Sequence, residues 1–180
     1  NILVVGGAGY IGSHMVRMLV REGHDVVVLD NLSTGYPASV KQGKLVRGDA
    51  GNQALVESVL EQHQIDAVMH FAAHALVGES VVHPAKYYRN NVVGTLSLLE
   101  AMRNVGVHRI VFSSTCATYG IPDSVPITEQ EKQKPVNPYG FTKLVCEHAL
   151  DDYAAAYGFA FAALRYFNAA GASPAGDIGE

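Results

Sequence analysis

Residues 1–12 constrain the fold of this chain more than any other stretch, because a short apolar strand there runs into a glycine-rich turn. Ile2–Val5 is long enough for one buried strand and too short for a helix. Three glycines follow at three-residue spacing: Gly6, Gly9 and Gly12. Such glycines permit a tight exit from the strand, close approach of the backbone to phosphate oxygens, and close packing of the next helix. The pattern predicts a helix from about Tyr10 whose first amides bind a pyrophosphate.

A second apolar strand, Val26–Asp30, ends in an acid 18 residues after Gly12. A carboxylate at this place in a dinucleotide-binding fold accepts hydrogen bonds from the hydroxyls of an adenosine ribose. The alternative is an ordinary βαβ unit in which Asp30 only caps the next segment. Because Asp30 would repel a 2′-phosphate and residues 31–35 contain no Arg, the sequence predicts NAD rather than NADP.

Apolar strands alternate with amphipathic helices along the whole chain, which predicts a parallel sheet covered on both faces. The fold class we expect is α/β, a doubly wound parallel sheet of Rossmann type in three α/β/α layers. We expect strands at 2–5, 26–30, 44–47, 66–71, 109–114 and 160–166, and helices at 10–22, 52–63, 85–105 and 139–157. Long loops at 31–43 and 115–138 would border a ligand crevice at the carboxyl ends of the strands.

The composition fits a compact globular domain, with 180 residues, 48% hydrophobic and 17% charged. A net charge of −4 without a Lys/Arg run argues against nucleic acid as the main partner. No stretch approaches the ~18 consecutive apolar residues of a membrane helix, so no membrane partner is expected. Cys116 and Cys146 are too few for a disulfide framework and predict reduced thiols in a cytoplasmic protein. Both ends of the chain indicate a part of a longer protein.

Tyr139 and Lys143 lie four residues apart at an expected helix start, so that a phenol and an ammonium share one helix face. They follow a hydroxyl, Thr115, at the end of an expected strand, and the three side chains can converge over a nicotinamide. A free phenol has a pKa of ~10, so a base at neutral pH needs a shift of about 3 units, or about 4 kcal/mol. We expect Lys143 and a cationic nicotinamide to supply it. Ordinary surface residues on an amphipathic helix are the alternative.

The glycine turn, Asp30, Thr115 and the Tyr139–Lys143 pair together resemble the extended short-chain dehydrogenase/reductase family. Further segments are similar to its bacterial UDP-glucose 4-epimerase branch: Gly6–His14, Leu29–Leu32, His70–Ala73, Val77–Ser80, Tyr87–Asn91, Asn137–Gly140, Leu164–Gly171 and Gly176–Glu180. The resemblance runs from end to end. It implies an NAD-binding domain at residues 1–167 and the start of a substrate-binding segment at 168–180, with most of a smaller C-terminal domain missing.

The resemblance also implies the site. Thr115, Tyr139 and Lys143 would be catalytic, and Asn168 would join Thr115 and Tyr139 in contacting a UDP-sugar. The residues implied at the NAD are Gly6, Gly9, Tyr10, Ile11 and Gly12 at the pyrophosphate, Asp30, Asn31, Leu32, Ser33, Thr34 and Gly35 at the adenosine ribose, Asp49 and Ala50 at the adenine, and Phe71, Ala72, Ala73, His74, Ala75, Asn90, Thr115, Tyr139, Lys143 and Phe167 along the rest. The implied activity is C4 epimerisation between UDP-glucose and UDP-galactose in galactose metabolism, by an isomerase that forms a homodimer.

Three positions depart from the family pattern. Val5 stands where Thr is common, Thr115 replaces the usual Ser, and Ala75 replaces a Lys that approaches the cofactor in some relatives. A 4,6-dehydratase is disfavoured, because Cys116 and Ala117 provide neither the acid nor the base that it needs beside Thr115. The open alternatives are a 4-epimerase of UDP-glucuronate or a UDP-N-acetylhexosamine, and a non-catalytic NAD-binding sensor.

A metal site is not expected. His70 and His74 are four residues apart, but they lie on either side of a strand end and have no third ligand at suitable spacing.

Overall fold

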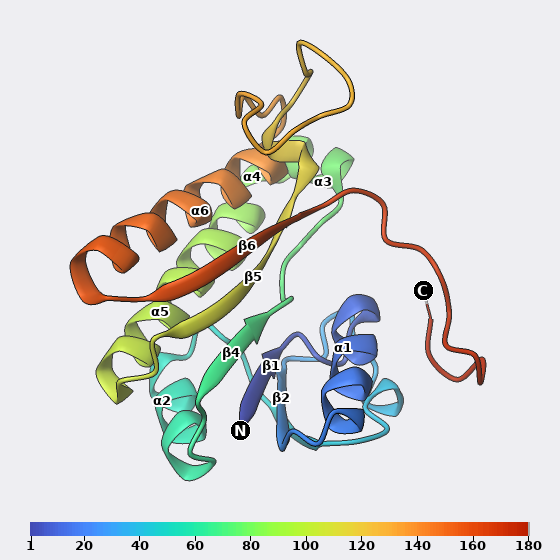
Figure 1. Ribbon diagram of the computed structural model, residues 1–180, viewed down its shortest axis with the longest axis vertical. Helices are drawn as coiled ribbons and strands as arrows, with labels where there is room; N and C mark the ends of the chain where they lie inside the picture. The colour runs from blue at the N-terminus through green and yellow to red at the C-terminus, as the bar shows by residue number, and fades with distance from the viewer. Residues whose placement is uncertain (180) are drawn as a thin grey trace.

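The computed structural model describes residues 1–179, and its strands form one parallel sheet (Figure 1). The strands are β1 (Ile2–Val5), β2 (Val26–Asp30), β3 (Lys44–Arg47), β4 (Ala67–His70), β5 (Arg109–Thr115) and β6 (Ala160–Tyr166). Their order is β3-β2-β1-β4-β5-β6. This is the doubly wound order, in which the winding reverses between β1 and β4 and a crevice opens at the carboxyl ends of the strands. The predicted fold class is confirmed.

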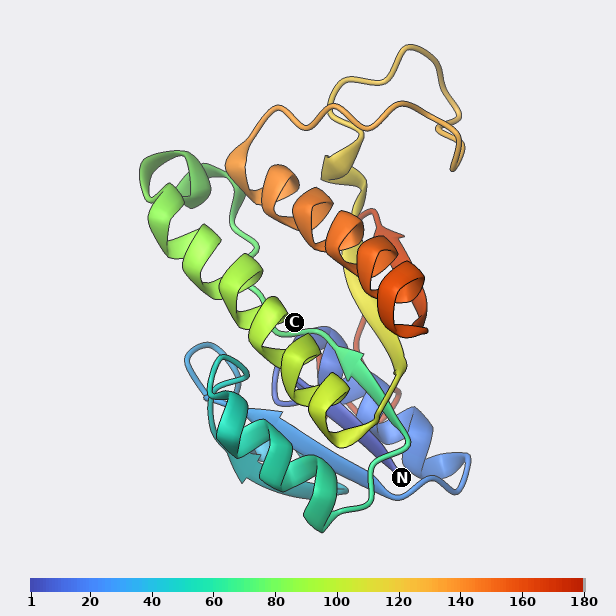
Figure 2. The same cartoon turned by 90° about the vertical axis from the view of Figure 1, so that its left-hand side faces the viewer.

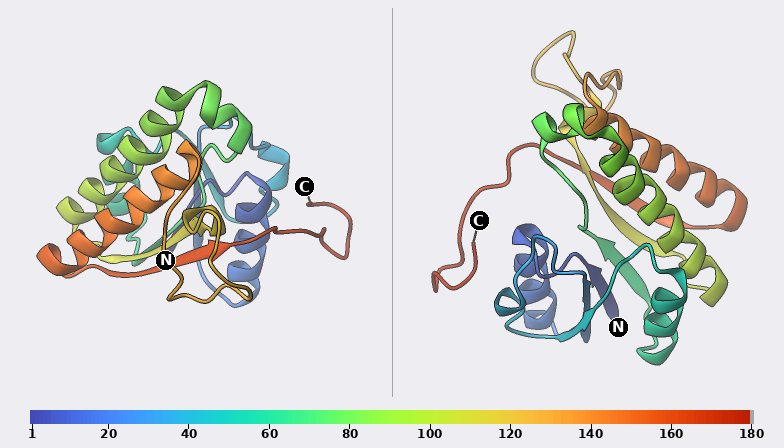
Figure 3. Two further views of the ribbon diagram at one scale, coloured as in Figure 1. Left: turned by 90° about the horizontal axis from the view of Figure 1, so that it is seen from above. Right: turned by 180° about the vertical axis from the view of Figure 1, so that it is seen from behind.

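Three helices, α2 (Gln53–Gln62), α5 (Gly94–Val105) and α6 (Pro138–Tyr157), lie side by side on one face of the sheet (Figure 2). Their apolar side chains bury the main core against the strands. Helix α1 (Tyr10–Arg21) lies on the other face, where Val16 packs against Val4, Val26 and Val28 (Figure 3). Both faces of β1 and β2 are therefore covered, as their continuous apolar sequences require, whereas alternate residues of β4, β5 and β6 are only partly buried or exposed.

The single helix expected at 85–105 was wrong in one respect, because the segment is not a continuous α-helix. Helix α4 (Pro84–Tyr87) passes into a π-helical turn, Tyr88–Val93, before α5 begins. Two side chains donate hydrogen bonds to one backbone carbonyl of this turn: the Asn91 carbonyl oxygen accepts from Thr95 Oγ1 (2.6 Å) and Cys146 Sγ (3.3 Å). Turns of this kind are frequent at functional sites. A short helix α3 (Val77–Val82) also lies in a segment for which no helix was predicted.

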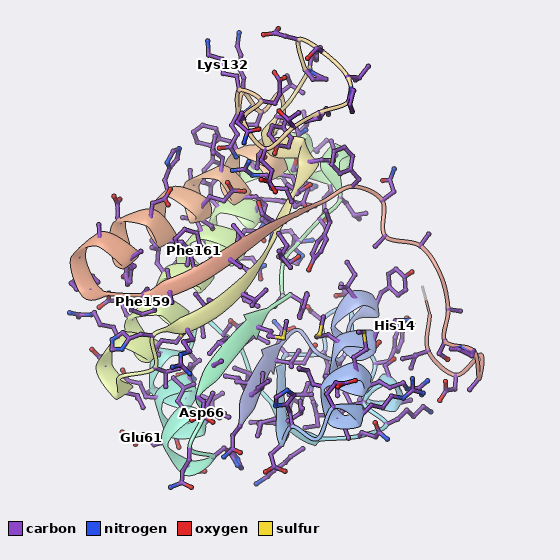
Figure 4. The ribbon with its side chains drawn as sticks, in the orientation of Figure 1. His14, Glu61, Asp66, Lys132, Phe159 and Phe161 are labelled. Carbon is purple, nitrogen blue, oxygen red and sulfur yellow. The ribbon has the colours of Figure 1, made fainter. Side chains whose placement is uncertain are left out.

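The two long loops both lie at the carboxyl ends of the strands, as predicted. Short 3₁₀ turns interrupt them at Pro37–Ser39 and Cys116–Thr118. Residues 119–137 project beyond β5, and Figure 4 shows Lys132 at the outer part of this loop, at the opposite end of the molecule from Glu61 and Asp66.

The chain after β6 returns along α1 (Figure 3). The Tyr10 hydroxyl donates to the Gly171 carbonyl (2.8 Å), and Arg17 pairs with Asp177 (2.5 Å). The segment 168–180, predicted as the start of a substrate-binding part, is described here as far as residue 179, and its last residue lies outside the described residues. Among residues 1–179, none of the helices combines the length and apolar character needed for a membrane span.

Candidate active site

The glycine turn between β1 and α1 is shaped by close backbone contacts. Gly6 has φ +80°, and a Cβ there would lie 2.5 Å from the backbone nitrogen of Ala72. A Cβ at Gly12 would lie 2.2 Å from the Gly6 carbonyl oxygen. Both positions therefore need glycine. Gly9 caps α1 without a side-chain hydrogen bond, so the first amides of the helix are open to an anion.

Asp30 has a structural role that includes the capping considered as the alternative from sequence, and adds a bond to the glycine turn that was not predicted. Its Oδ2 accepts a hydrogen bond from the Ala8 amide (2.9 Å) and its Oδ1 accepts one from the Leu32 amide (2.8 Å). The residue is 8% exposed, at the end of β2. Asp30 therefore braces the glycine turn against the next loop, while each oxygen keeps a lone pair for a further donor.

One cleft at the carboxyl ends of β1, β2, β3 and β4 brings together most of the predicted cofactor residues. Its lining includes Gly6, Gly9, Asp30, Asn31, Ser33, Thr34, Gly35, Asp49, Ala50, Phe71, Ala72, Ala73, His74 and Asn90. These residues come from loops that follow four different strands and from the π-helical turn. The cleft thus lies at the reversal point of the sheet, where this fold class binds nucleotides.

The other predicted cofactor residues lie outside this lining. Tyr10, Ile11 and Gly12 form the first turn of α1, and Leu32 (φ +61°) binds Asp30 through its amide. Ala75 is exposed just after the lining segment. Phe167 is 60% exposed and follows β6, next to the exposed Asn168. Neither Phe167 nor Asn168 therefore lines this cleft in the described structure.

The three predicted catalytic residues converge where β5 meets α6. Thr115 is the last residue of β5, while Tyr139 and Lys143 lie in the first two turns of α6. The Asn137 side chain fixes the helix start by accepting from the Gly140 amide (2.8 Å). A Cβ at Gly140 would lie 2.5 Å from the Ala117 carbonyl oxygen, so glycine lets α6 approach the end of β5 closely.

Burial raises the pKa of Tyr139 above that of a free phenol, and a hydrogen bond with Thr115 only partly lowers it. Lys143 is not among the causes of this shift, so its expected effect on the pKa of Tyr139 stays a prediction for the NAD-bound site. The Lys143 ammonium instead donates to the Ser113 carbonyl (2.7 Å) and lies over the Phe112 ring. Lowering the pKa of Tyr139 would therefore depend on charge brought by a ligand.

Lys143 is 3% exposed, and this burial lowers its pKa to about 8. His70, at the end of β4, is also buried, and burial lowers its pKa to about 3, so its imidazole is neutral. The Thr95 hydroxyl donates to the Asn91 carbonyl, so it must accept from His70 Nε2 (3.1 Å). His70 Nδ1 is then an acceptor, and it has no hydrogen-bond partner within residues 1–179.

Asn91 joins the cofactor cleft to the catalytic helix, and the sequence analysis missed this role. Its side chain binds both the amide (2.9 Å) and the carbonyl (3.0 Å) of His74, which lines the cleft. It also contacts Thr142 Oγ1 (3.1 Å) on α6, and the Thr142 hydroxyl donates to the Tyr139 carbonyl (2.7 Å). Asn91 is 2% exposed, so these bonds hold two parts of one site in a fixed relation.

Five further residues line the cleft without having been predicted: Val5, Leu29, Gly48, His70 and Gly94. The sequence could have indicated Gly94, because a glycine inside a helix lowers the stability of the helix and suggests a place where a ligand approaches the backbone. His70 was considered only as a metal ligand, and the described residues hold no group of side chains suited to a metal ion.

The fold and the site define a nucleotide-binding protein with a hydroxyl, a phenol and an ammonium beside its cleft. The model of the NAD dependent epimerase/dehydratase family matches residues 2–179, and the chain belongs to this family.

Among curated proteins, a UDP-glucose 4-epimerase of Rhizobium meliloti is 56% identical over 180 residues, covering 100% of this chain and 55% of that protein. The chain thus spans about half the length of the relative.

Solved structures give the same result. UDP-glucose 4-epimerase from Brucella ovis in complex with NAD is 56% identical with a TM-score of 0.99, covering 100% of this chain and 55% of that one. The UDP-Glc/GlcNAc 4-epimerase from Campylobacter jejuni is 41% identical with a TM-score of 0.89, covering 93% of this chain and 53% of that one.

Proposed function

We propose that the full-length protein is an isomerase that interconverts UDP-glucose and UDP-galactose by NAD-dependent epimerisation at C4, through a transient 4-keto sugar. The observation that carries this proposal is the convergence of Thr115, Tyr139 and Lys143 beside a glycine-turn cleft, in a chain of the NAD dependent epimerase/dehydratase family. The relatives named UDP-glucose 4-epimerase support the choice of substrate.

The cleft fits NAD in two respects. The open amides of α1 suit a pyrophosphate, and Gly6 and Gly12 leave backbone where a side chain would block the turn. Asp30 offers carboxylate lone pairs at the place where an adenosine ribose presents its hydroxyls. When bound, NAD would accept the hydride from the sugar C4 and return it.

The chain's own residues would move the proton. Tyr139 would take the proton of the sugar 4-hydroxyl and return it after the keto sugar has presented its other face. Thr115, whose hydroxyl interacts with Tyr139, would hold the oxygen on C4. Lys143 would bind the nicotinamide ribose and add positive charge that favours the phenolate. Asn168 would bind the nucleotide part of the substrate.

Of the alternatives from the sequence, one has specific support. Acceptance of a UDP-N-acetylhexosamine is supported by the similarity to the Campylobacter jejuni enzyme, named for UDP-Glc and GlcNAc, whereas nothing beyond the shared C4 chemistry favours UDP-glucuronate. A non-catalytic NAD sensor would have no use for Tyr139 and Lys143 beside Thr115.

We also propose a homodimer. Exposed apolar side chains gather near the starts of α5 and α6, where the Tyr88 and Phe141 rings lie 6.5 Å apart, with Val82, Val93 and Leu96 also exposed. Exposed apolar surface of this kind marks interaction sites. Replacing Tyr88 and Phe141 together by Glu should give a monomer in sedimentation, and an unchanged mass would contradict this interface. The cytoplasmic location stays a prediction from cysteine usage.

The substrate proposal is tested by incubating the full-length protein with UDP-galactose, UDP-glucuronate and UDP-N-acetylglucosamine, with no NAD added. We expect UDP-glucose from the first and NAD in the supernatant after denaturation. Tyr139→Phe is the matched control, since it keeps the ring and removes the hydroxyl. Turnover of UDP-glucuronate alone would favour a 4-epimerase of that sugar. Absence of any turnover in a protein that holds NAD would favour the non-catalytic sensor.

A further inference from the structure

An ion pair between a buried carboxylate and a partly buried guanidinium lies directly behind the catalytic end of β5, outside the cofactor cleft. Glu147 on α6 is 5% exposed, and its carboxylate accepts from Arg165 of β6 through Nη2 (2.7 Å) and Nε (3.1 and 3.2 Å). Arg165 also donates to the Tyr119 hydroxyl (2.9 Å) and lies over the Tyr119 ring. The proposed reaction uses none of these three side chains.

Glu147 is tied to the catalytic strand through Ser114. The Ser114 hydroxyl donates to Glu147 Oε1, and Ser114 is 2% exposed. Gln133 Nε2 binds the other carboxylate oxygen (2.9 Å) from the projecting loop. Burial disfavours the charged form of Glu147, but the bonds from Arg165, Ser114 and Gln133 outweigh burial and hold its pKa below the ordinary value.

The contacts between α6 and the end of β5 form a regular set. Tyr139, Lys143 and Glu147 are spaced four residues apart, so they lie along one face of α6. Lys143 contacts the Ser113 carbonyl and Glu147 contacts the Ser114 hydroxyl, and Thr115, the next residue of β5, is the one that lowers the pKa of Tyr139. Tyr139 and Lys143 are the predicted catalytic residues of this helix face. The contact of Glu147 holds Ser114, which lies between Ser113 and Thr115 in the same strand end.

Stability alone does not account for an ion pair here, because replacing a buried pair by apolar residues is often neutral or stabilising. A role in positioning does account for the ion pair, since a bidentate contact with Arg165 fixes the orientation of the Glu147 carboxylate as well as its distance. Arg165 stands opposite Ser114 in the β5–β6 register, so it holds Glu147 over the residue that Glu147 positions.

We propose that Glu147, oriented by Arg165, is a positioning residue that holds the Ser114–Thr115 end of β5 at the correct place against Tyr139 and Lys143. This inference rests on the proposed function for its kinetic readout. A displacement of about 1 Å at a catalytic group can reduce turnover by about a hundredfold, so loss of this link would lower kcat more than it raises KM.

The chain offers a matched pair of variants. Ser114→Ala and Gln133→Ala each remove one hydrogen bond to the same carboxylate, but only Ser114 belongs to the catalytic strand. In the full-length protein we expect Ser114→Ala to lower kcat at least about tenfold with KM nearly unchanged, and Gln133→Ala to stay within about twofold of the parent. Equal effects of the two variants would overturn the proposal.

A second pair of variants separates placement from folding. Arg165→Met leaves a buried unpaired carboxylate and should lower the melting temperature, whereas Glu147→Leu combined with Arg165→Met should restore it. We expect kcat to stay low in the double variant. Recovery of kcat together with the melting temperature would show that the pair serves stability only.

A readout without turnover keeps this inference separate from the proposed function. The pKa of Tyr139 can be followed by NMR of labelled tyrosine in the NAD complex, with the resonance assigned from Tyr139→Phe. Because the Thr115 contact lowers that pKa, Ser114→Ala should raise it and Gln133→Ala should not. An unchanged pKa in Ser114→Ala would refute the positioning role even if the parent protein turns over no UDP-sugar. Absence of turnover with the expected pKa change would count against the proposed function alone.

Discussion

Replacing Asp30 tests the two roles that the structure gives to one carboxylate. Asp30→Ala removes the acceptor of the Ala8 and Leu32 amides, at 2.9 and 2.8 Å, in a residue that is 8% exposed. Hydrogen bonds to charged groups contribute about 1.5–3 kcal/mol each, so two lost bonds cost at most about 6 kcal/mol. Because water can enter beside the cleft, we expect a loss of about 3 kcal/mol in the free energy of unfolding without NAD.

The free energy of unfolding of Asp30→Asn should lie between those of the parent and Asp30→Ala, since its amide oxygen can satisfy only one of the two backbone donors. The loss of the ribose contacts should weaken NAD binding by about 3 kcal/mol, or about a hundredfold. The affinity for NADP should rise relative to the affinity for NAD, because the variants lack the negative charge that repels a 2′-phosphate.

The measurements are urea denaturation of the protein without NAD and calorimetric titration with each cofactor. Asp151→Ala, which removes an exposed carboxylate of α6, is the control and should change the unfolding free energy by less than about 0.5 kcal/mol. Unchanged stability of Asp30→Ala together with weaker NAD binding would refute the bracing role. Equal or tighter binding of NADP by the parent would refute the cofactor preference.

Three further predictions concern the catalytic residues, and a fourth concerns the segment as a whole. Tyr139→Phe should lower kcat by several orders of magnitude while NAD stays bound, and a variant within about tenfold of the parent would mean that another group takes the proton. Thr115→Ala should be similarly damaging and Thr115→Ser mild, so a Ser variant as poor as Ala would contradict the hydroxyl's role. Since the pKa of Lys143 is lowered from 10.5 to about 8, the unfolded chain holds a proton between these pH values that the folded chain has lost. The contribution of Lys143 to stability should therefore rise with pH across this window, and unfolding free energies that change in parallel with pH in the parent and in Lys143→Met would contradict the shift. Residues 1–180 alone should bind NAD without turning over a UDP-sugar, because they span about half of their relatives; turnover near that of the full-length protein would refute this.

The strands and the cofactor turn could be predicted from sequence because their signals are local. Ile2–Val5, Gly6 and Gly12 specify a strand, a left-handed turn and a close approach within a few residues. Residues of the cleft such as Asp49 and Asn90 were found through family resemblance, and the structure gathers them because parallel strands end at one edge of the sheet.

The contacts that connect distant segments could not be predicted. The side-chain hydrogen bonds of Asn91 depend on His74 and Thr142, which lie 17 and 51 residues away along the chain. The direction of the Lys143 ammonium depends on the Ser113 carbonyl, which no spacing rule reveals. Glu147 lies in an ordinary helix pattern and Arg165 in an ordinary strand pattern, and only their contact in the folded chain shows that they act as a pair.

Transfer of hydrogen at C4 tests the central claim most directly. The full-length protein would be incubated with UDP-galactose carrying deuterium at C4, and the UDP-glucose formed would be analysed by mass spectrometry and NMR. If NAD held in this cleft takes and returns the hydride while Tyr139 moves only the hydroxyl proton, the product keeps the deuterium at C4 and Tyr139→Phe forms almost none. Exchange of the label with solvent, or equal product from Tyr139→Phe, would contradict the account.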